Sequence, residues 1–70
     1  MTMTLVKSTN LFAVGYEAWS ATLEIHFRNG SVYEYLDVPP GVYDALVAAE
    51  SPGQFHRQNI IDHYHFRRIL

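Results

Sequence analysis

The chain has 70 residues, of which 49% are hydrophobic, 14% aromatic and only 17% charged, and it contains no cysteine. This length corresponds to one domain, over residues 1–70, whose hydrophobic core barely outweighs the conformational entropy of the chain. The composition excludes a disulfide framework and a thiolate metal site, and no apolar run reaches the ~18 residues of a membrane span. The first ten residues lack the basic and apolar regions of a secretory signal, so we expect a cytoplasmic protein.

Charge is distributed unevenly along the chain. Residues 1–50 carry two basic and six acidic side chains, a net charge of −4, whereas residues 51–70 carry three arginines and one aspartate, a net charge of +2. The basic end is a weak signal for a polyanion partner, because strong nucleic-acid binders concentrate more lysine and arginine on one face. The low overall charge indicates that part of the surface is covered by a partner.

Two strands are predicted in the first half of the chain. Residues 11–19 mix β-branched and aromatic side chains around Gly15, which is typical of a strand with a bulge or bend at the glycine. Residues 21–27 alternate cleanly, with Leu23, Ile25 and Phe27 on one face, and therefore predict a half-buried strand.

The segment FRNGS that follows decides how the next strand pairs. A two-residue turn over Asn29 and Gly30 would mix polar and apolar side chains on each face. A three-residue connection over residues 28–30, with Gly30 left-handed in a bulge, keeps the apolar side chains together. We therefore predict that Phe27 pairs with Ser31, Ile25 with Tyr33, and Leu23 with Tyr35. Both tyrosines then belong to the core side, and their hydroxyls need partners at its edge.

Two helices are predicted in the second half. Pro39 and Pro40 end the strand, after which Val42, Tyr43, Leu46 and Val47 recur with helical spacing until the segment ESPG at residues 50–53. Residues 54–64 predict a second short helix, which buries Phe55, Ile60 or Ile61, and Tyr64. The tail HFRRIL is either a last short strand or an ordered end. The predicted fold is α+β, a three-stranded antiparallel meander with one packed helix and a second short C-terminal helix.

The last sixteen residues contain three of the four histidines. On a strand, His63 and His65 point the same way, and Asp62 or His56 completes a metal site, but on a helix the pair diverges. A catalytic set of Ser51, His56 and Asp62 lacks a nucleophile elbow, and Ser51 is explained as a cap after the first helix. We expect no metal, no cofactor and no catalytic residue.

The same segment suits an anionic ligand, because arginine and histidine contact phosphates and aromatic rings stack on bases. The candidate binding residues are Ser51, Gly53, His56, Arg57, Tyr64, Arg67 and Arg68. The alternative is that the aromatic residues are core and the arginines a solvated rim. In that case the partner is another protein or a second copy of the chain.

A set of residues with a specific joint spacing runs through nearly the whole chain: Ser8, the stretch from Ala13 to Tyr16, the strand from Leu23 to Phe27, Gly30, Tyr33, Tyr35, Val38, Pro39, Tyr43, Ser51, Gly53, Phe55, Ile60 and Tyr64. On these residues the chain resembles the KTSC domain, a small module found at the C-terminus of some lysyl-tRNA synthetases and as a free-standing protein of bacteria and phages. The resemblance implies a contact with RNA or a nucleotide.

Two positions depart from the pattern of the KTSC domain. Its members often carry a basic residue where this chain has Ile61, and an aromatic residue where it has His56. The resemblance therefore implies that His56 is partly a core residue. Taken together, we expect a non-catalytic binding module for RNA or a nucleotide, with a protein-interaction or homodimeric module as the alternative.

Overall fold

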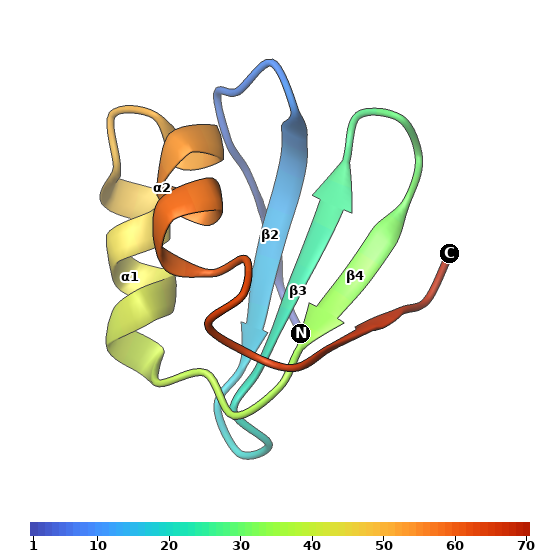
Figure 1. The fold of residues 1–70 in the computed structure, drawn as a ribbon, viewed down its shortest axis with the longest axis vertical. Helices are drawn as coiled ribbons and strands as arrows, with labels where there is room; N and C mark the ends of the chain where they lie inside the picture. Colours follow the sequence, from blue (N-terminus) through green and yellow to red (C-terminus); the bar gives the residue numbers. More distant parts are fainter.

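The computed structural model describes all 70 residues as an antiparallel sheet with two helices on one of its faces (Figure 1). The strands are β1 (Met3–Leu5), β2 (Leu11–Glu17), β3 (Thr22–Phe27), β4 (Val32–Tyr35) and β5 (Phe66–Arg68). The helices α1 (Pro40–Ala48) and α2 (Pro52–Asn59) lie between β4 and β5 in the chain. The sheet order follows the chain, β1-β2-β3-β4-β5, and every neighbouring pair is antiparallel.

The predicted hairpin between β3 and β4 is confirmed in its register. Leu23 pairs with Tyr35 and Ile25 with Tyr33. Gly30 has a φ of 93°, and its N–H donates to the carbonyl of Phe27 at 3.0 Å. This left-handed glycine is what allows the three-residue connection, and it places the apolar side chains of both strands on the core face.

The α+β class is confirmed, but the sheet has five strands and not three. The two further strands, β1 and β5, have three residues each and form the two edges of the sheet. Segments this short carry almost no alternation signal, and they are strands because each pairs with a longer neighbour. Residues Phe66–Arg68 of the tail HFRRIL thus form a strand, the first of the two alternatives considered for it.

The irregularity predicted at Gly15 lies elsewhere in β2. The register shifts between Leu11 and Ala13, while Gly15 pairs regularly with Met3 and Glu24. A Cβ atom at Gly15 would lie 2.5 Å from the sulfur of Met3. The glycine therefore makes room for the methionine side chain on the face of the sheet that the helices leave uncovered, which we call the bare face.

The helices cover the other face and complete the core. The first helix buries Leu46 fully. The helical spacing predicted that Val47 also faces the core, but its side chain is 38% exposed. The second helix starts at Pro52 and ends at Asn59, whereas it was predicted over residues 54–64, because a proline that ends one helix can also occupy the first position of the next. Ile60, just beyond this helix, is fully buried. The buried core consists of Leu11, Val14, Leu23, Ile25, Tyr35, Val38, Leu46 and Ile60.

No helix is long and apolar enough to cross a membrane.

Candidate functional site

Aromatic side chains gather where β4 and β5 meet the loop that follows α2. They enclose a hollow of about 180 Å³. We call this hollow the aromatic groove, and its lining residues are Tyr33, Tyr35, Ile61, Asp62, Tyr64 and Phe66. Strand pairing positions three of these rings. Tyr35 of β4 is opposite Phe66 of β5, and Tyr33 lies two residues before Tyr35, on the same face of the sheet.

The rings of the aromatic groove are stacked on one another. The ring centroids of Tyr33 and Phe66 are 5.3 Å apart with planes inclined by 20°, and those of Tyr33 and Tyr35 are 6.4 Å apart at 26°. Tyr35 is buried at the bottom of this stack, whereas Phe66 is 56% exposed. A large aromatic ring held by its neighbours and open to solvent offers a flat surface on which another planar group can stack.

A second hollow of about 330 Å³ adjoins the aromatic groove and shares Tyr33, Tyr35 and Ile61 with it. Its other lining residues are mostly polar, and we call it the polar hollow: Asn10, Phe27, Asn29, Ser31, His56 and Arg57. The β3–β4 turn supplies Asn29 and Ser31, while α2 supplies His56 and Arg57. A flat apolar surface therefore lies directly beside a polar one that carries a cation.

His56 forms the buried wall between α2 and the sheet. It is only 3% exposed, and its Nε2 is 2.9 Å from the hydroxyl oxygen of Tyr35. Its ring also packs edge-on against Phe27, with the centroids 5.4 Å apart. The hydroxyl of Tyr35 thus has the partner that its position at the core edge requires.

Burial changes the ionisation of both members of this pair. Burial first, and then the positive charge of Arg57, lowers the pKa of His56 to about 4. The Nδ1 atom of His56 is buried without a hydrogen-bond partner, so a protonated ring would carry an N–H with no acceptor. Burial, followed by the charge of Tyr33, raises the pKa of Tyr35 to about 12. Both groups are therefore neutral near pH 7, and His56 does not offer a positive charge to a ligand.

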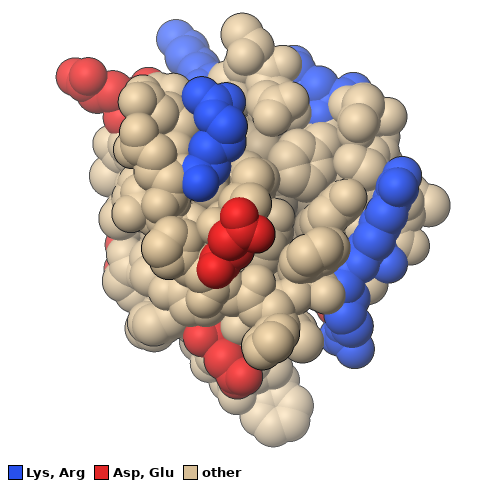
Figure 2. Space-filling view, viewed as in Figure 1, with Lys and Arg blue, Asp and Glu red and all other residues tan.

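The three C-terminal arginines do not all face the same side of the sheet. Arg68 is opposite Tyr33 in the register, so its side chain leaves the sheet on the face that carries the aromatic groove. Arg67 is opposite Glu34 on the other face, and its Nη2 is 2.7 Å from Glu34 Oε1. Arg57 is exposed on α2 and lines the polar hollow. On the side of the molecule that Figure 2 shows, the lysine and arginine side chains lie in separate patches and form no continuous basic surface.

The remaining candidate residues lie in or near the start of α2 and in the loop after it. Ser51 is the N-cap of α2, where its hydroxyl accepts from the N–H of Gln54 at 3.3 Å. Gly53 is buried, and a Cβ atom there would lie 3.0 Å from the hydroxyl oxygen of Ser8. Tyr64 lines the aromatic groove and packs against the core. Ser51 and Gly53 therefore have structural explanations, while Tyr64 belongs to the groove.

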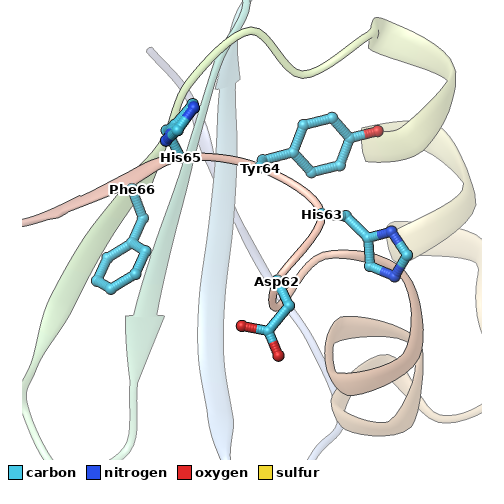
Figure 3. A pocket seen from close by; sticks show the side chains of 5 residues that line it. All are labelled: Asp62, His63, Tyr64, His65 and Phe66. Carbon is cyan, nitrogen blue, oxygen red and sulfur yellow. The ribbon is translucent and has the colours of Figure 1, made fainter.

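The loop with the two neighbouring histidines encloses a shallow hollow of about 390 Å³ (Figure 3), lined by residues 62–66. The His63 and His65 side chains leave this loop in different directions (Figure 3). The Nε2 of His63 is 3.1 Å from the carbonyl oxygen of Gln58. No three His, Cys, Asp or Glu side chains in the chain come together as metal ligands.

Only Tyr64 of the aromatic groove was among the candidate binding residues from the sequence; the other five were not: Tyr33, Tyr35, Ile61, Asp62 and Phe66. The predicted hairpin register already placed Tyr33 beside Tyr35 on the core side, and that was a usable signal. The pairing that brings Phe66 onto Tyr33 requires β5, which the sequence left open.

The chain is thus a small α+β domain in which two helices cover one face of an antiparallel sheet, and it carries an aromatic groove beside β4 and β5. The profile of the KTSC domain matches residues 7–64. The chain belongs to the KTSC domain family.

Relatives and a solved structure agree with this membership. The chain is 37% identical over 65 residues to an uncharacterized protein of Stutzerimonas stutzeri, covering 91% of this chain and 92% of the relative. It is 43% identical over 54 residues to a lysine–tRNA ligase of Nostoc punctiforme, covering 77% of this chain but only 10% of the ligase. The crystal structure of a KTSC domain protein from Yersinia pestis matches with a TM-score of 0.93 at 31% identity, covering 99% of this chain and 97% of that one.

Proposed function

We propose that the protein is a non-catalytic binding module of the cytoplasm, which holds a nucleotide or a segment of RNA in the aromatic groove. The observation that carries the proposal is the half-exposed ring of Phe66, stacked on Tyr33 beside a polar hollow that contains Arg57. Unstacked bases bind to aromatic side chains of this kind, and arginines contact the phosphates that accompany the bases.

The charges around the groove favour a few specific phosphate contacts over a general attraction to polyanions. Arg57 lines the polar hollow, and Arg68 leaves the sheet on the groove side next to Tyr33. Arg67 lies on the opposite face and is paired with Glu34. Binding through two arginines releases few counterions, so the expected affinity is modest and sensitive to salt.

The relatives support RNA as the ligand class. A segment similar to this chain forms about a tenth of two lysine–tRNA ligases, from Nostoc punctiforme and Trichormus variabilis, and the name of these enzymes states tRNA as a substrate. A module that contacts RNA would be useful both within such an enzyme and as a separate protein.

The arrangement of the histidines supports a module without catalysis. His56 is the one buried histidine, and its Nε2 is occupied by the Tyr35 hydroxyl. Ser51 uses its hydroxyl to cap α2, away from any histidine hydrogen bond. Covalent catalysis requires a nucleophile within hydrogen-bond reach of a general base. Ser51 and His56 do not form such a pair.

Amide chemical shifts in two-dimensional NMR spectra test the proposal directly. Titration with single-stranded RNA and with mononucleotides at low salt should shift the peaks of Tyr33, Arg57, Tyr64 and Phe66, while those of Glu24 and Glu34 on the bare face stay in place. Each phosphate contact with a single strand adds about 0.7 to the slope of log K against log salt. Arg57→Ala and Arg68→Ala should each lower this slope by about that amount, and Arg67→Ala is the matched control. Groove peaks that remain unmoved by every ligand would refute the proposal.

Self-association is a second candidate function, favoured by apolar side chains at both edges of the sheet. Leu5 in β1 is 70% exposed, and Ile69 and Leu70 after β5 are 54% and 72% exposed. Unpaired edge strands with apolar side chains readily pair with another chain. Sedimentation over a wide concentration range should then show a rising mass, and a constant monomer mass would exclude a homodimer.

A further inference from the structure

We propose that the base held in the aromatic groove is guanine, and that Asp62 selects it through hydrogen bonds to the Watson–Crick edge. This inference rests on the proposed function of the groove as a nucleotide or RNA site. It adds the chemical identity of the base and a residue that determines specificity.

Asp62 is the one charged residue that lines the aromatic groove. Its side chain is exposed, and its carboxylate makes no hydrogen bond or ion pair within the chain. Figure 3 shows Asp62 and Phe66 extending from the same side of the loop, whereas His65 extends to the other side. The carboxylate is therefore free to accept hydrogen bonds from a group that enters the groove.

The backbone holds Asp62 in a defined conformation. Its φ is 67°, a left-handed value that aspartate and asparagine tolerate better than most residues. The N–H of Ile61 donates to the carbonyl of His56 at 3.0 Å, and the N–H of His63 donates to that of Ile60 at 3.1 Å. Both residues that flank Asp62 are hydrogen-bonded to the end of α2. The backbone that carries the carboxylate is therefore fixed relative to the aromatic groove.

The chemistry of the four bases decides which of them fits an ionised carboxylate. A carboxylate only accepts hydrogen bonds, and it can accept two at once. Guanine alone presents two adjacent N–H donors, N1–H and the 2-amino group, on its Watson–Crick edge. Adenine and cytosine place a ring nitrogen lone pair beside their amino group, and uracil flanks its single N–H with two carbonyls. Both oxygens of the Asp62 carboxylate therefore meet donors only on guanine, whereas on each of the other bases one oxygen would face a lone pair.

Size and charge assign the two hollows to different parts of the ligand. The aromatic groove, at about 180 Å³, is smaller than the roughly 300–1,000 Å³ of a pocket for a whole small molecule, and suits one planar base. The carboxylate of Asp62 repels phosphate from this groove. The adjoining polar hollow of about 330 Å³ contains Arg57 and shares Tyr33, Tyr35 and Ile61 with the groove. A base in the groove thus leaves its sugar and phosphate at the cation.

Binding of GMP and AMP to wild-type protein and to the variant Asp62→Asn tests the inference by isothermal titration calorimetry at low salt. Asparagine keeps the left-handed backbone and the size of the side chain, so the variant should fold. Asp37→Asn is the matched control, because Asp37 is also exposed, has a φ of 56° and lies outside the groove. A bidentate contact discriminates one base from another, so wild type and Asp37→Asn should bind GMP about tenfold more tightly than AMP, a difference of about 1.4 kcal/mol.

Asp62→Asn should move the two affinities in opposite directions. GMP binding should weaken because one accepting oxygen is lost, and AMP binding should strengthen because a negative charge is removed. Equal affinity of wild type for GMP and AMP, with Asp62→Asn strengthening both alike, would overturn the guanine inference and leave the groove as a nucleotide site. If neither nucleotide nor RNA binds, the proposed function fails together with the inference. Comparing the RNA pentamers UUGUU and UUAUU with free GMP distinguishes a guanine within RNA from a free nucleotide.

Discussion

The stability of the domain should fall steeply in mild acid because of one buried histidine. His56 is 3% exposed, its Nε2 contacts the Tyr35 hydroxyl and its Nδ1 has no partner. Burial and the nearby Arg57 lower its pKa from 6.5 to about 4 in the folded protein. In the unfolded chain the ring is free to bind a proton at its ordinary pKa, so the unfolded state is favoured as the pH falls below about 6.5.

The size of the effect follows from the two pKa values. A difference of one pKa unit corresponds to about 1.36 kcal/mol, so protonation of His56 in the unfolded chain alone should remove about 3 kcal/mol of stability between pH 7 and pH 4. Below about pH 4 the folded state also binds the proton, and no further loss arises from this residue. For a domain of this size, 3 kcal/mol is a large part of a free energy of unfolding that is commonly about 5–15 kcal/mol.

Urea unfolding followed by circular dichroism, at steps between pH 7 and pH 4, measures this loss. The variant His56→Phe is the control, because phenylalanine keeps an aromatic ring in the same core position but cannot bind a proton. Its stability at pH 7 is lower, since the hydroxyl of Tyr35 loses its partner, but its decline toward pH 4 should be about 3 kcal/mol smaller than that of wild type. Parallel declines of the two proteins would show that His56 is not a buried neutral group.

Two further predictions concern the fold itself. Leu46→Ala should cost about 2–5 kcal/mol in urea unfolding, because Leu46 is the one fully buried side chain of α1, whereas Val47→Ala at its exposed neighbour should cost less than about 1 kcal/mol; similar costs would contradict the described packing of α1. Gly30→Ala should destabilise the protein by about 1 kcal/mol or more because its φ is 93°. Gly41→Ala in the first turn of α1 should instead be neutral or stabilise by up to about 1 kcal/mol. An added Cβ meets open space at both glycines, so the difference between the two variants comes from the backbone conformation alone. Thermal unfolding that ranks these two glycine variants in the opposite order would refute the assignment of the turn.

The hairpin and the helices could be predicted because their signals are local. The alternation around Leu23 and Ile25, and the position of Gly30, determine the register without reference to the rest of the chain. The proline-led start of α1 is likewise contained in a few residues, whereas Pro52, which was read as the end of the first helix, is the first residue of α2. The edge strands β1 and β5 could not be predicted in the same way, because three residues become a strand only when a longer strand lies beside them.

The site was predicted less completely, for a related reason. The sequence pointed to the C-terminal segment, and Arg57, Tyr64 and Arg68 do lie at or beside the aromatic groove. Its stacked surface, however, joins Phe66 of β5 to Tyr33 of β4, two residues far apart in the chain. The opposite directions of Arg67 and Arg68 also follow from strand pairing, since neighbours on a strand face opposite sides of the sheet.

The measurement that tests the central proposal most directly is the affinity of three proteins for one single-stranded RNA at low salt: wild type, Phe66→Ala and Trp19→Ala. Both substitutions remove a solvent-exposed aromatic ring, 56% exposed at Phe66 and 88% at Trp19, but only Phe66 lines the aromatic groove. Stacking of a base on an aromatic ring is worth about 1–3 kcal/mol, so Phe66→Ala should raise Kd about tenfold while Trp19→Ala leaves it unchanged. Equal affinities for all three proteins, or no binding by wild type, would contradict the account of the aromatic groove as a site for bases.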